Sequence, residues 1–472
     1  MADIKMLSIL MTRLSSLSTL RQLPALCRSW KTTSLCLQAP GCSSSTRKNY
    51  LHTHSVSKAP SQSKSVVHRI PCRTQHSSSS SGSFSVNVSP EKKYLVLREV
   101  NCEPANFHAV WLRHNCQCVE CKQPYSGQKT IDVSRLRPSY SISSIRLEPD
   151  DVARVEWNEE DHASVYPLVF LKQNKYSSGE LNRMRSSTEP IMCKHVPKVE
   201  YKDVLGDEGL LKWMHLINEY GICLIQNVPV SNGMVRTVAE HIWPVQQTIY
   251  GHTFDVKSEL QPINIAYSDA KLDFHMDLAY YESPPGIQFL HCLKFDDCVE
   301  GGQSTFIDAW HAAKMLQLQY HNDFDVLTQV SATFQKIHAD RDRPVHMKYQ
   351  RPHISVDPNG QIVGVFWSPA FEGPLQVEDR FVEPYYKAYN RFASLICSSP
   401  TRIKFRLVPG DLIGFNNRRL LHGRGEIHLN GGERHLQGCY INIDEFKSRL
   451  EVLSRKSGKN LSIRHVLNQS WF

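Results

Sequence analysis

Short apolar runs separated by turn residues recur through the second half of the chain. Examples are residues 286–293, 304–308 and 405–415, which contain or adjoin Gly, Pro or Asp. Such regular spacing of short strands and turn signals favours a β-sandwich or barrel. Residues 203–220 instead repeat apolar positions with a helical period, and a buried strand is predicted at 221–228. The pattern therefore predicts a mixed α/β, mainly β, domain over residues 190–460.

A smaller, β-rich domain is predicted ahead of it, over residues 91–185. Residues 94–100 alternate between apolar and other side chains, as a half-buried strand does. Residues 171–190 are rich in Lys, Asn, Ser and Gly and show no apolar period, which is typical of a linker at a domain boundary.

Residues 1–90 have the composition of a targeting segment. They hold eleven basic side chains and one acid, Asp3, and they are rich in Ser. Residues 6–21 can form a helix with Leu on one side and Arg and Ser on the other, as mitochondrial presequences do. A secretory signal fits less well, because Arg13 interrupts the apolar run. We expect a disordered basic leader on a mitochondrial protein, with a merely disordered tail on a cytoplasmic protein as the alternative.

The distribution of charge argues against a nucleic-acid partner. The chain has 472 residues and a formal net charge of +9. The leader alone contributes +10, so residues 91–472 sum to −1 and lack the basic excess that drives phosphate binding. No run of about 18 apolar residues is present, so we expect neither a transmembrane helix nor a membrane partner.

Three cysteines in the small domain are candidate zinc ligands. Fourteen cysteines in 472 residues are too sparse for a disulfide scaffold, so reduced thiols or metal ligands are expected. Cys116, Cys118 and Cys121 can converge on one ion across a tight turn. Because structural zinc takes four N or S ligands, we expect His162 as the fourth, with His114 as the second choice. Three free thiols are the alternative interpretation.

The chemistry of the large domain is predicted from His275, Asp277 and the distant His422. In an extended strand residues i and i+2 point the same way, so His275 and Asp277 can bind one metal. A histidine from another strand completes two His and one carboxylate on one face, the arrangement of non-haem Fe(II) oxygenases. Other His-x-Asp triplets begin at His321 and His338. The first lies in a run with helical period, where i and i+2 diverge.

Arg434 strengthens this interpretation. It follows His422 by twelve residues and is placed to bind a dicarboxylate cosubstrate through two parallel hydrogen bonds. Such a triplet alone is a weak signal, since about two triplets of His-x-Asp or His-x-Glu are expected by chance in a chain of this composition. The full set of four residues is specific.

At these residues the chain resembles the 2-oxoglutarate-dependent γ-butyrobetaine and trimethyllysine dioxygenases, within the larger taurine-dioxygenase-like group. The resemblance covers residues 92–460 and includes the cysteine-bearing segment 111–121. Its main motifs are Tyr250-Gly-His-Thr-Phe254, Phe274-His-Met-Asp277, Pro284-Pro-Gly-Ile-Gln288, His291-Cys-Leu-Lys294, Arg419-Leu-Leu-His-Gly-Arg424 and Arg434-His-Leu-Gln-Gly-Cys-Tyr440.

The resemblance implies a double-stranded β-helix (jelly-roll) catalytic domain preceded by a small zinc-bearing domain. It implies Fe(II) held by His275, Asp277 and His422, and 2-oxoglutarate anchored by Arg434. Dioxygen would be the oxidant and ascorbate the reductant. The family also suggests a homodimer.

The substrate implied by the resemblance is a small molecule with a trimethylammonium group. An aromatic cage binds that group, because each ring face attracts a desolvated quaternary ammonium by about 0.5–2 kcal/mol. The matching positions are Tyr250, Phe254, Tyr267 and Tyr440.

Departures from the family bear on which substrate is used. Phe254 stands where Trp is usual, Met276 stands where Thr is common, and segment 366–369 lacks an Asn pair. Asn264, a further expected substrate-binding residue, and the complete cysteine set resemble the butyrobetaine branch, whereas the leader is typical of the trimethyllysine enzyme.

We predict hydroxylation of γ-butyrobetaine to L-carnitine, the last step of carnitine biosynthesis. Trimethyllysine hydroxylation is the alternative. A second alternative is a non-catalytic relative that binds methylated amines, which the complete set of metal and arginine positions disfavours.

Overall fold

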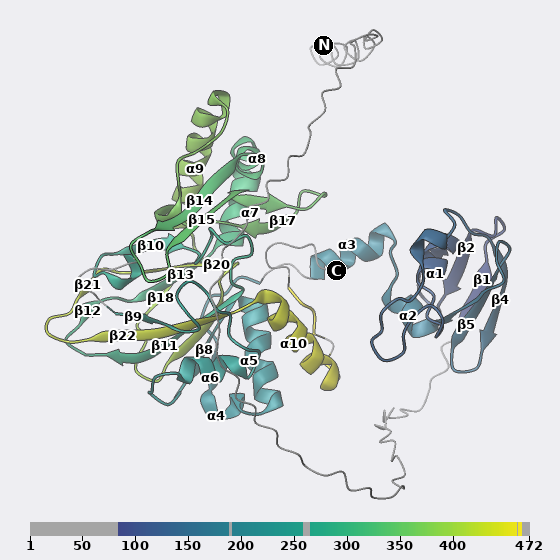
Figure 1. Cartoon of the computed structure of the whole chain (residues 1–472), viewed down its shortest axis with the longest axis horizontal. Helices are drawn as coiled ribbons and strands as arrows, with labels where there is room; N and C mark the ends of the chain where they lie inside the picture. The colour runs from purple at the N-terminus through teal and green to yellow at the C-terminus, as the bar shows by residue number, and fades with distance from the viewer. Residues whose placement is uncertain (1–83, 188–190, 258–264, 460, 465–472) are drawn as a thin grey trace, which may run out of the picture. The chain divides into compact units, whose positions relative to one another are not determined.

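The computed structural model describes residues 84–187, 191–257, 265–459 and 461–464 (Figure 1). Residues 1–83 of the expected leader and Asn264 therefore lie outside the described residues. No helix in the described part of the chain is both long enough and apolar enough to cross a membrane. The small and large domains are each described by themselves below.

The small domain consists of two three-stranded antiparallel sheets and three helices. The strand orders are β1-β2-β3 and β4-β5-β6. Alternate residues of β2 are buried, as its apolar pattern predicts, and Leu95 and Leu97 join Phe107 and Tyr166 in one core. The elements are β1 Ser85–Val88, β2 Tyr94–Arg98, β3 Ala105–His108, α1 Ala109–His114, β4 Ile142–Glu148, β5 Val152–Trp157, β6 Ala163–Pro167, α2 Leu168–Gln173 and α3 Ser178–Ser187.

Two expected boundaries of this domain differ from the structure. The fold begins before residue 91, because β1 pairs with β2 along its whole length. β1 has only four residues and no fully buried side chain, so its sequence carries no strong signal, and pairing with β2 decides its conformation. The segment expected as a linker, 171–190, contains the end of α2 and all of α3. Leu171 is fully buried in the core, which holds α2 in place despite the polar composition.

Two facing sheets form the large domain and confirm the predicted double-stranded β-helix (Figure 1). One sheet has the order β10-β20-β13-β18, and the other has the order β7-β8-β19-β11-β22-β9. The strands are β7 Lys198–Glu200, β8 Ile222–Gln226, β9 Phe254–Val256, β10 Leu272–His275, β11 Ile287–Phe295, β13 Ser304–Asp308, β18 Ile403–Phe405, β19 Leu412–Asn416, β20 Leu420–Arg424 and β22 Arg434–Ile441. A short pair, β12 Glu300–Gly301 with β21 Ile427–His428, lies beside them.

The long strand β11 shows how the layers are built. Its residues Ile287 and Phe289 pack against a layer of helices, whereas Leu290 and Cys292 point to the interior between the sheets. This two-sided burial follows from the alternation of side chains along a strand. The helices of that layer are α4 Tyr201–Val204, α5 Asp207–Tyr220, α6 Met234–Glu240 and α10 Ile443–Lys456.

A second group of helices and hairpins covers the end of the domain near β10 and β20. Its core contains Met276, Leu278 and Tyr440, which belong to the segments that carry the predicted metal ligands and cage. The elements are α7 Ala309–Gln319, α8 His321–Gln329, β14 Ser331–His338, β15 Val345–Pro352, β16 Ile354–Val356, β17 Ile362–Val365 and α9 Val382–Cys397.

Candidate active site

Two predicted metal ligands face each other across a pair of strands. β10 and β20 are antiparallel, and His275 lies directly opposite His422. Side chains of opposed residues share one face of a sheet and lie close together. The two imidazole centroids are accordingly 4.3 Å apart, and both side chains are buried.

Asp277 completes the cluster, although it does not lie on a strand as the i, i+2 argument expected. β10 ends at His275, and Leu278 adopts a left-handed backbone with φ of +57°. The Oδ1 of Asp277 is 3.4 Å from Nε2 of His275 and 3.9 Å from Nε2 of His422. The three ligand atoms lie within 4.8 Å of one another, so the structure brings the predicted triad together.

The protonation of the triad suits metal binding. The Nδ1 of His275 is 2.8 Å from the carbonyl oxygen of Asp273, which acts as acceptor and leaves Nε2 free to face the other ligands. Burial, together with the nearby His275, lowers the pKa of His422 to about 3. Burial alone would raise the pKa of Asp277, but hydrogen bonding and the charge of the two histidines hold it below its usual range. Two imidazole nitrogens and a carboxylate oxygen are the donor set that a facial Fe(II) site uses.

A cavity of about 70 Å³ lies beside the triad. Four predicted cage positions and Arg434 line it together with all three triad residues. The predicted residues are Tyr250, Phe254, Tyr267, Tyr440, Arg434, His275, Asp277 and His422. Sequence reasoning missed the other lining residues, among them Tyr280, Gln288, Ser304, Phe371 and Arg424. Gln288 and Arg424 stand inside the motifs of the resemblance, so their position in those motifs was the available signal.

Aromatic rings are packed against one another on this lining. Phe254 stacks on Tyr440 with ring centroids 5.1 Å apart, and Tyr250 lies 6.4 Å from Phe254. The hydroxyls of Tyr250 and Tyr280 are 3.4 Å apart. The hydroxyl of Tyr440 donates a hydrogen bond of 2.7 Å to Oδ2 of Asp277. The aromatic lining is therefore joined directly to the triad.

Arg434 begins β22 and is only 4% exposed. Its Nε has no hydrogen-bond partner among the described residues. Burial, with the neighbouring Arg424, lowers its pKa to about 9. The terminal nitrogens of Arg424 donate to three backbone carbonyls within residues 266–270. A buried guanidinium without a carboxylate is costly, so the site around Arg434 fits an anionic ligand such as a dicarboxylate.

The other His-x-Asp triplets gather no metal site among the described residues. His321 opens α8, and its Nε2 lies 3.6 Å from Asp325 one helical turn further on. His338 ends β14, and Asp340 follows in the loop. Helical geometry separates the first triplet, as the sequence predicted.

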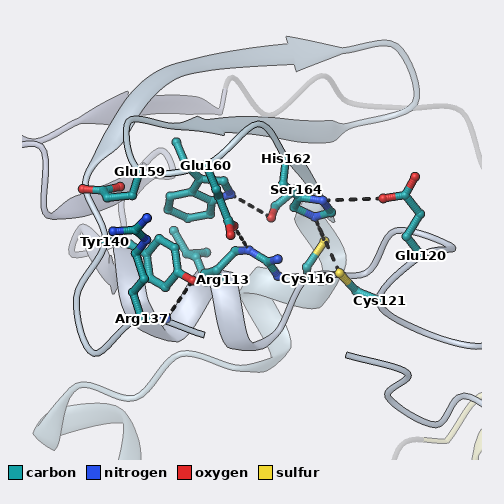
Figure 2. A network of polar contacts seen from close by, with 12 residues as sticks. Arg113, Cys116, Glu120, Cys121, Arg137, Tyr140, Glu159, Glu160, His162 and Ser164 are labelled. Atoms are coloured by element: carbon teal, nitrogen blue, oxygen red, sulfur yellow. Dashed lines mark hydrogen bonds and ion pairs between the residues drawn. The ribbon is translucent and has the colours of Figure 1, made fainter. Parts of the chain in front are cut away.

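The small domain holds a second cluster of ligand atoms, of which those of Cys116, Cys121 and His162 are drawn in Figure 2. The sulfurs of Cys116, Cys118 and Cys121 lie 3.5, 3.8 and 3.6 Å from Nε2 of His162. A tetrahedral zinc with ordinary bond lengths separates S and N ligands by about 3.6 Å. The structure brings His162, and not the second choice His114, to the three thiols. The four residues thus fit a structural zinc ion.

Neighbouring groups are arranged to support thiolates. The guanidinium of Arg113 is paired with Glu160 and donates to the sulfur of Cys121 (Figure 2). Burial would raise the pKa of Cys116, but hydrogen bonds from Ser164 and His162 lower it to about 7. Zinc binds the deprotonated thiol. These contacts favour that form at Cys116, whereas burial and the neighbouring Cys116 and Cys118 raise the pKa of Cys121 to about 12 despite the contact with Arg113.

Two family models match the chain. Residues 185–440 match the taurine catabolism dioxygenase TauD, TfdA family. Residues 86–172 match the gamma-butyrobetaine hydroxylase-like N-terminal domain. The matches coincide with the large and small domains.

Individual relatives agree with these matches. The gamma-butyrobetaine dioxygenase of Pseudomonas sp. (strain AK-1) is 30% identical and aligns with 74% of this chain and 91% of its own length. That of Homo sapiens is 30% identical, over 75% of this chain and 92% of its own length. The mitochondrial trimethyllysine dioxygenase of Gallus gallus is 27% identical, over 74% of this chain and 83% of its own length. At these identities the relatives do not distinguish between the two substrates.

Proposed function

The chain belongs to the TauD, TfdA family and is an Fe(II)- and 2-oxoglutarate-dependent dioxygenase, and from this premise we propose that it hydroxylates γ-butyrobetaine to L-carnitine. The observation that carries the proposal is the contact between the aromatic lining and the triad. Tyr440 stacks on Phe254 and donates its hydroxyl to Asp277. A cation bound against these rings therefore lies beside the metal ligands.

The proposed roles of the polar residues follow from their donor atoms. His275, Asp277 and His422 would hold Fe(II) through two nitrogens and one oxygen. Arg434 would bind the far carboxylate of 2-oxoglutarate through charge-assisted hydrogen bonds. With 2-oxoglutarate, the bound iron supplies the activation of dioxygen, and the overall reaction yields succinate, CO2 and one hydroxyl group on the substrate.

The protein's own contribution is binding and orientation. Tyr250, Phe254, Tyr267 and Tyr440 would surround the trimethylammonium group and fix which carbon faces the triad. Phe254 makes a weaker cation–π partner than Trp, and the cavity adds Tyr280 to the lining. The site would thus select by the position of the cation relative to the reacting carbon.

Trimethyllysine is the second candidate substrate. Two observations favour it, namely the basic leader and the similarity to mitochondrial trimethyllysine dioxygenases. Asn264, the residue that favours γ-butyrobetaine, lies outside the described residues. The non-catalytic alternative is disfavoured by a complete triad with Arg434 in the same cavity.

The test is turnover by the full chain with Fe(II), 2-oxoglutarate, O2 and ascorbate. γ-Butyrobetaine and trimethyllysine are offered separately, and mass spectrometry detects the gain of one oxygen. We expect product from γ-butyrobetaine, and we expect His422→Ala to abolish it because one of three metal ligands is lost. His321→Ala is the matched control, since His321 lies on α8 outside the cavity.

Each other result has a distinct meaning. Product from trimethyllysine alone would replace the proposed substrate by the alternative. Consumption of 2-oxoglutarate without product from either compound would indicate another substrate. Binding of γ-butyrobetaine with no consumption of 2-oxoglutarate would support the non-catalytic relative.

Further proposals concern the protein's other properties. We propose a structural zinc ion in the small domain, supported by the spacing of its four ligand atoms.

Mitochondrial localisation is proposed from the leader and the mitochondrial relatives, and import into isolated mitochondria tests it. A homodimer is proposed from the resemblance alone, and light scattering tests it. Nucleic acid and membrane partners are not proposed.

A further inference from the structure

Asp277 needs support that the strands do not provide. It follows the end of β10, and the next residue, Leu278, has a left-handed backbone. A residue after a strand lacks the regular backbone hydrogen bonds that fix its neighbours in the sheet. Its carboxylate nevertheless has to meet two histidines that are fixed by strand pairing.

The side chain of Asn417 replaces the missing backbone contacts. Its Oδ1 accepts a 2.8 Å hydrogen bond from the backbone N–H of Asp277. Its Nδ2 donates 3.1 Å hydrogen bonds to the carbonyl oxygens of Asp277 and Pro285. Asn417 is 1% exposed and lies in the turn between β19 and β20, the strand that carries His422. One amide therefore ties Asp277 to the strand of another ligand.

The hydroxyl of Tyr440 fixes the carboxylate itself. It donates to Oδ2 at 2.7 Å, while Oδ1 is the oxygen near the two histidine Nε2 atoms. An O–H···O⁻ hydrogen bond of this kind is among the stronger ones in proteins. With Oδ2 engaged, Asp277 presents one oxygen to a metal and leaves the remaining positions for other ligands.

We propose that Asn417 and Tyr440 are positioning residues for Asp277, and that Tyr440 serves both halves of the site. Its ring belongs to the cation cage, and its hydroxyl sets the metal carboxylate. This inference rests on the proposed function, because it requires a metal at the triad. Tyr440→Phe separates the two roles, since it keeps the ring and removes only the hydroxyl.

The experiment measures Mn(II) and tetramethylammonium binding to the full, zinc-loaded chain by titration calorimetry. Mn(II) prefers oxygen and nitrogen ligands, so it reports on the triad rather than on the thiols. Loss of a hydrogen bond to a metal ligand commonly costs 10–100-fold in metal affinity. We expect Tyr440→Phe to weaken Mn(II) binding by about tenfold or more. Its affinity for tetramethylammonium without metal should stay within about twofold, because the ring remains.

Two further variants sharpen the test. Asn417→Asp keeps the acceptor for the Asp277 N–H and loses both N–H donations, so we expect it to weaken Mn(II) binding as well. Tyr385→Phe is the matched control: it also removes a buried hydroxyl, which is bonded to His353 at 2.8 Å, and should leave both affinities unchanged.

The outcomes distinguish this inference from the proposed function. Equal Mn(II) affinity of Tyr440→Phe and the unaltered protein would overturn the role of the hydroxyl while leaving the triad intact. Failure of the unaltered protein to bind Mn(II) would overturn both. Parallel weakening of Mn(II) and tetramethylammonium binding would mean a general structural defect and would also refute the positioning role.

Discussion

Gly438 sets the shape of the aromatic lining at the level of a single residue. It lies on β22 directly across from Phe254 of β9. A Cβ at this position would lie 2.4 Å from Cζ of Phe254 and 2.9 Å from Leu290. The ring of Phe254 therefore rests over the glycine, and only the absence of a side chain lets it stack on Tyr440.

We expect Gly438→Ala to weaken γ-butyrobetaine binding. The added methyl group displaces Phe254 from its stacked position, which removes about 1 kcal/mol of cation–π attraction and raises the KM for the substrate roughly fivefold. The KM for 2-oxoglutarate should change little, because the atoms nearest to the new methyl group belong to Phe254 and Leu290. Steady-state kinetics with each compound varied in turn checks this. Gly206→Ala, which meets no atom within 4 Å, is the control.

At the level of elements, strand pairing brings the residues of the triad together, and the proposed zinc ion would do the same for the cysteine cluster. The register of β10 against β20 brings His275 opposite His422, and a slip of one residue would point one imidazole to the other face. In the small domain, Cys116–Cys121 follows α1, whereas His162 lies between β5 and β6. A zinc ion would cross-link these two segments.

Removal of the proposed zinc ion should lower the stability of the small domain against unfolding. Because zinc binding contributes directly to folding free energy, we expect Cys118→Ser to lose the zinc ion and to lower the unfolding midpoint of this domain by at least about 5 °C. Metal analysis and calorimetry check both effects. Cys102→Ser is the matched control, since Cys102 is an exposed thiol outside the cluster. A Cys118→Ser protein that retained both the zinc and the midpoint would contradict the assignment.

At the level of the whole molecule, the large domain buries two histidines whose pKa values are lowered, so both are neutral at pH 7. His291 and His353 are both fully buried. Burial, with the nearby His435, lowers the pKa of His291 to about 4, and burial lowers that of His353 to about 4. In the unfolded chain both imidazoles return to about 6.5. Between these values the unfolded state binds more protons than the folded state.

Stability should therefore fall as the pH is lowered through the window from 6.5 to 4. For each histidine the loss between pH 7 and pH 5 is about 2 kcal/mol, and above pH 7 the contribution is constant. Urea unfolding at the two pH values measures it. We expect His353→Gln to reduce the pH-dependent loss by about that amount. His321→Gln, at an exposed position on α8, should leave the pH dependence unaltered.

The sequence by itself determined the class of fold and the residues to be examined at both sites. Cys116, Cys118 and Cys121, the pair His275 and Asp277, and the pair His422 and Arg434 could each be recognised because residue type and short spacing are local properties. Apolar periods likewise marked α5 and β11, since each buries a side chain at a regular interval.

Only the tertiary structure decided how distant residues meet. Asp277 is held by Asn417, which is 140 positions away, and Phe254 stacks on Tyr440 through the pairing of β9 with β22. The strand β1 formed because it pairs with β2, and α2 in the expected linker formed because Leu171 is buried in the core, not because of their own composition. Periodicity fixes which face of an element is apolar, but the register between elements far apart in the chain depends on packing and turn geometry. That register is what places a carboxylate, two imidazoles and an aromatic ring around one cavity.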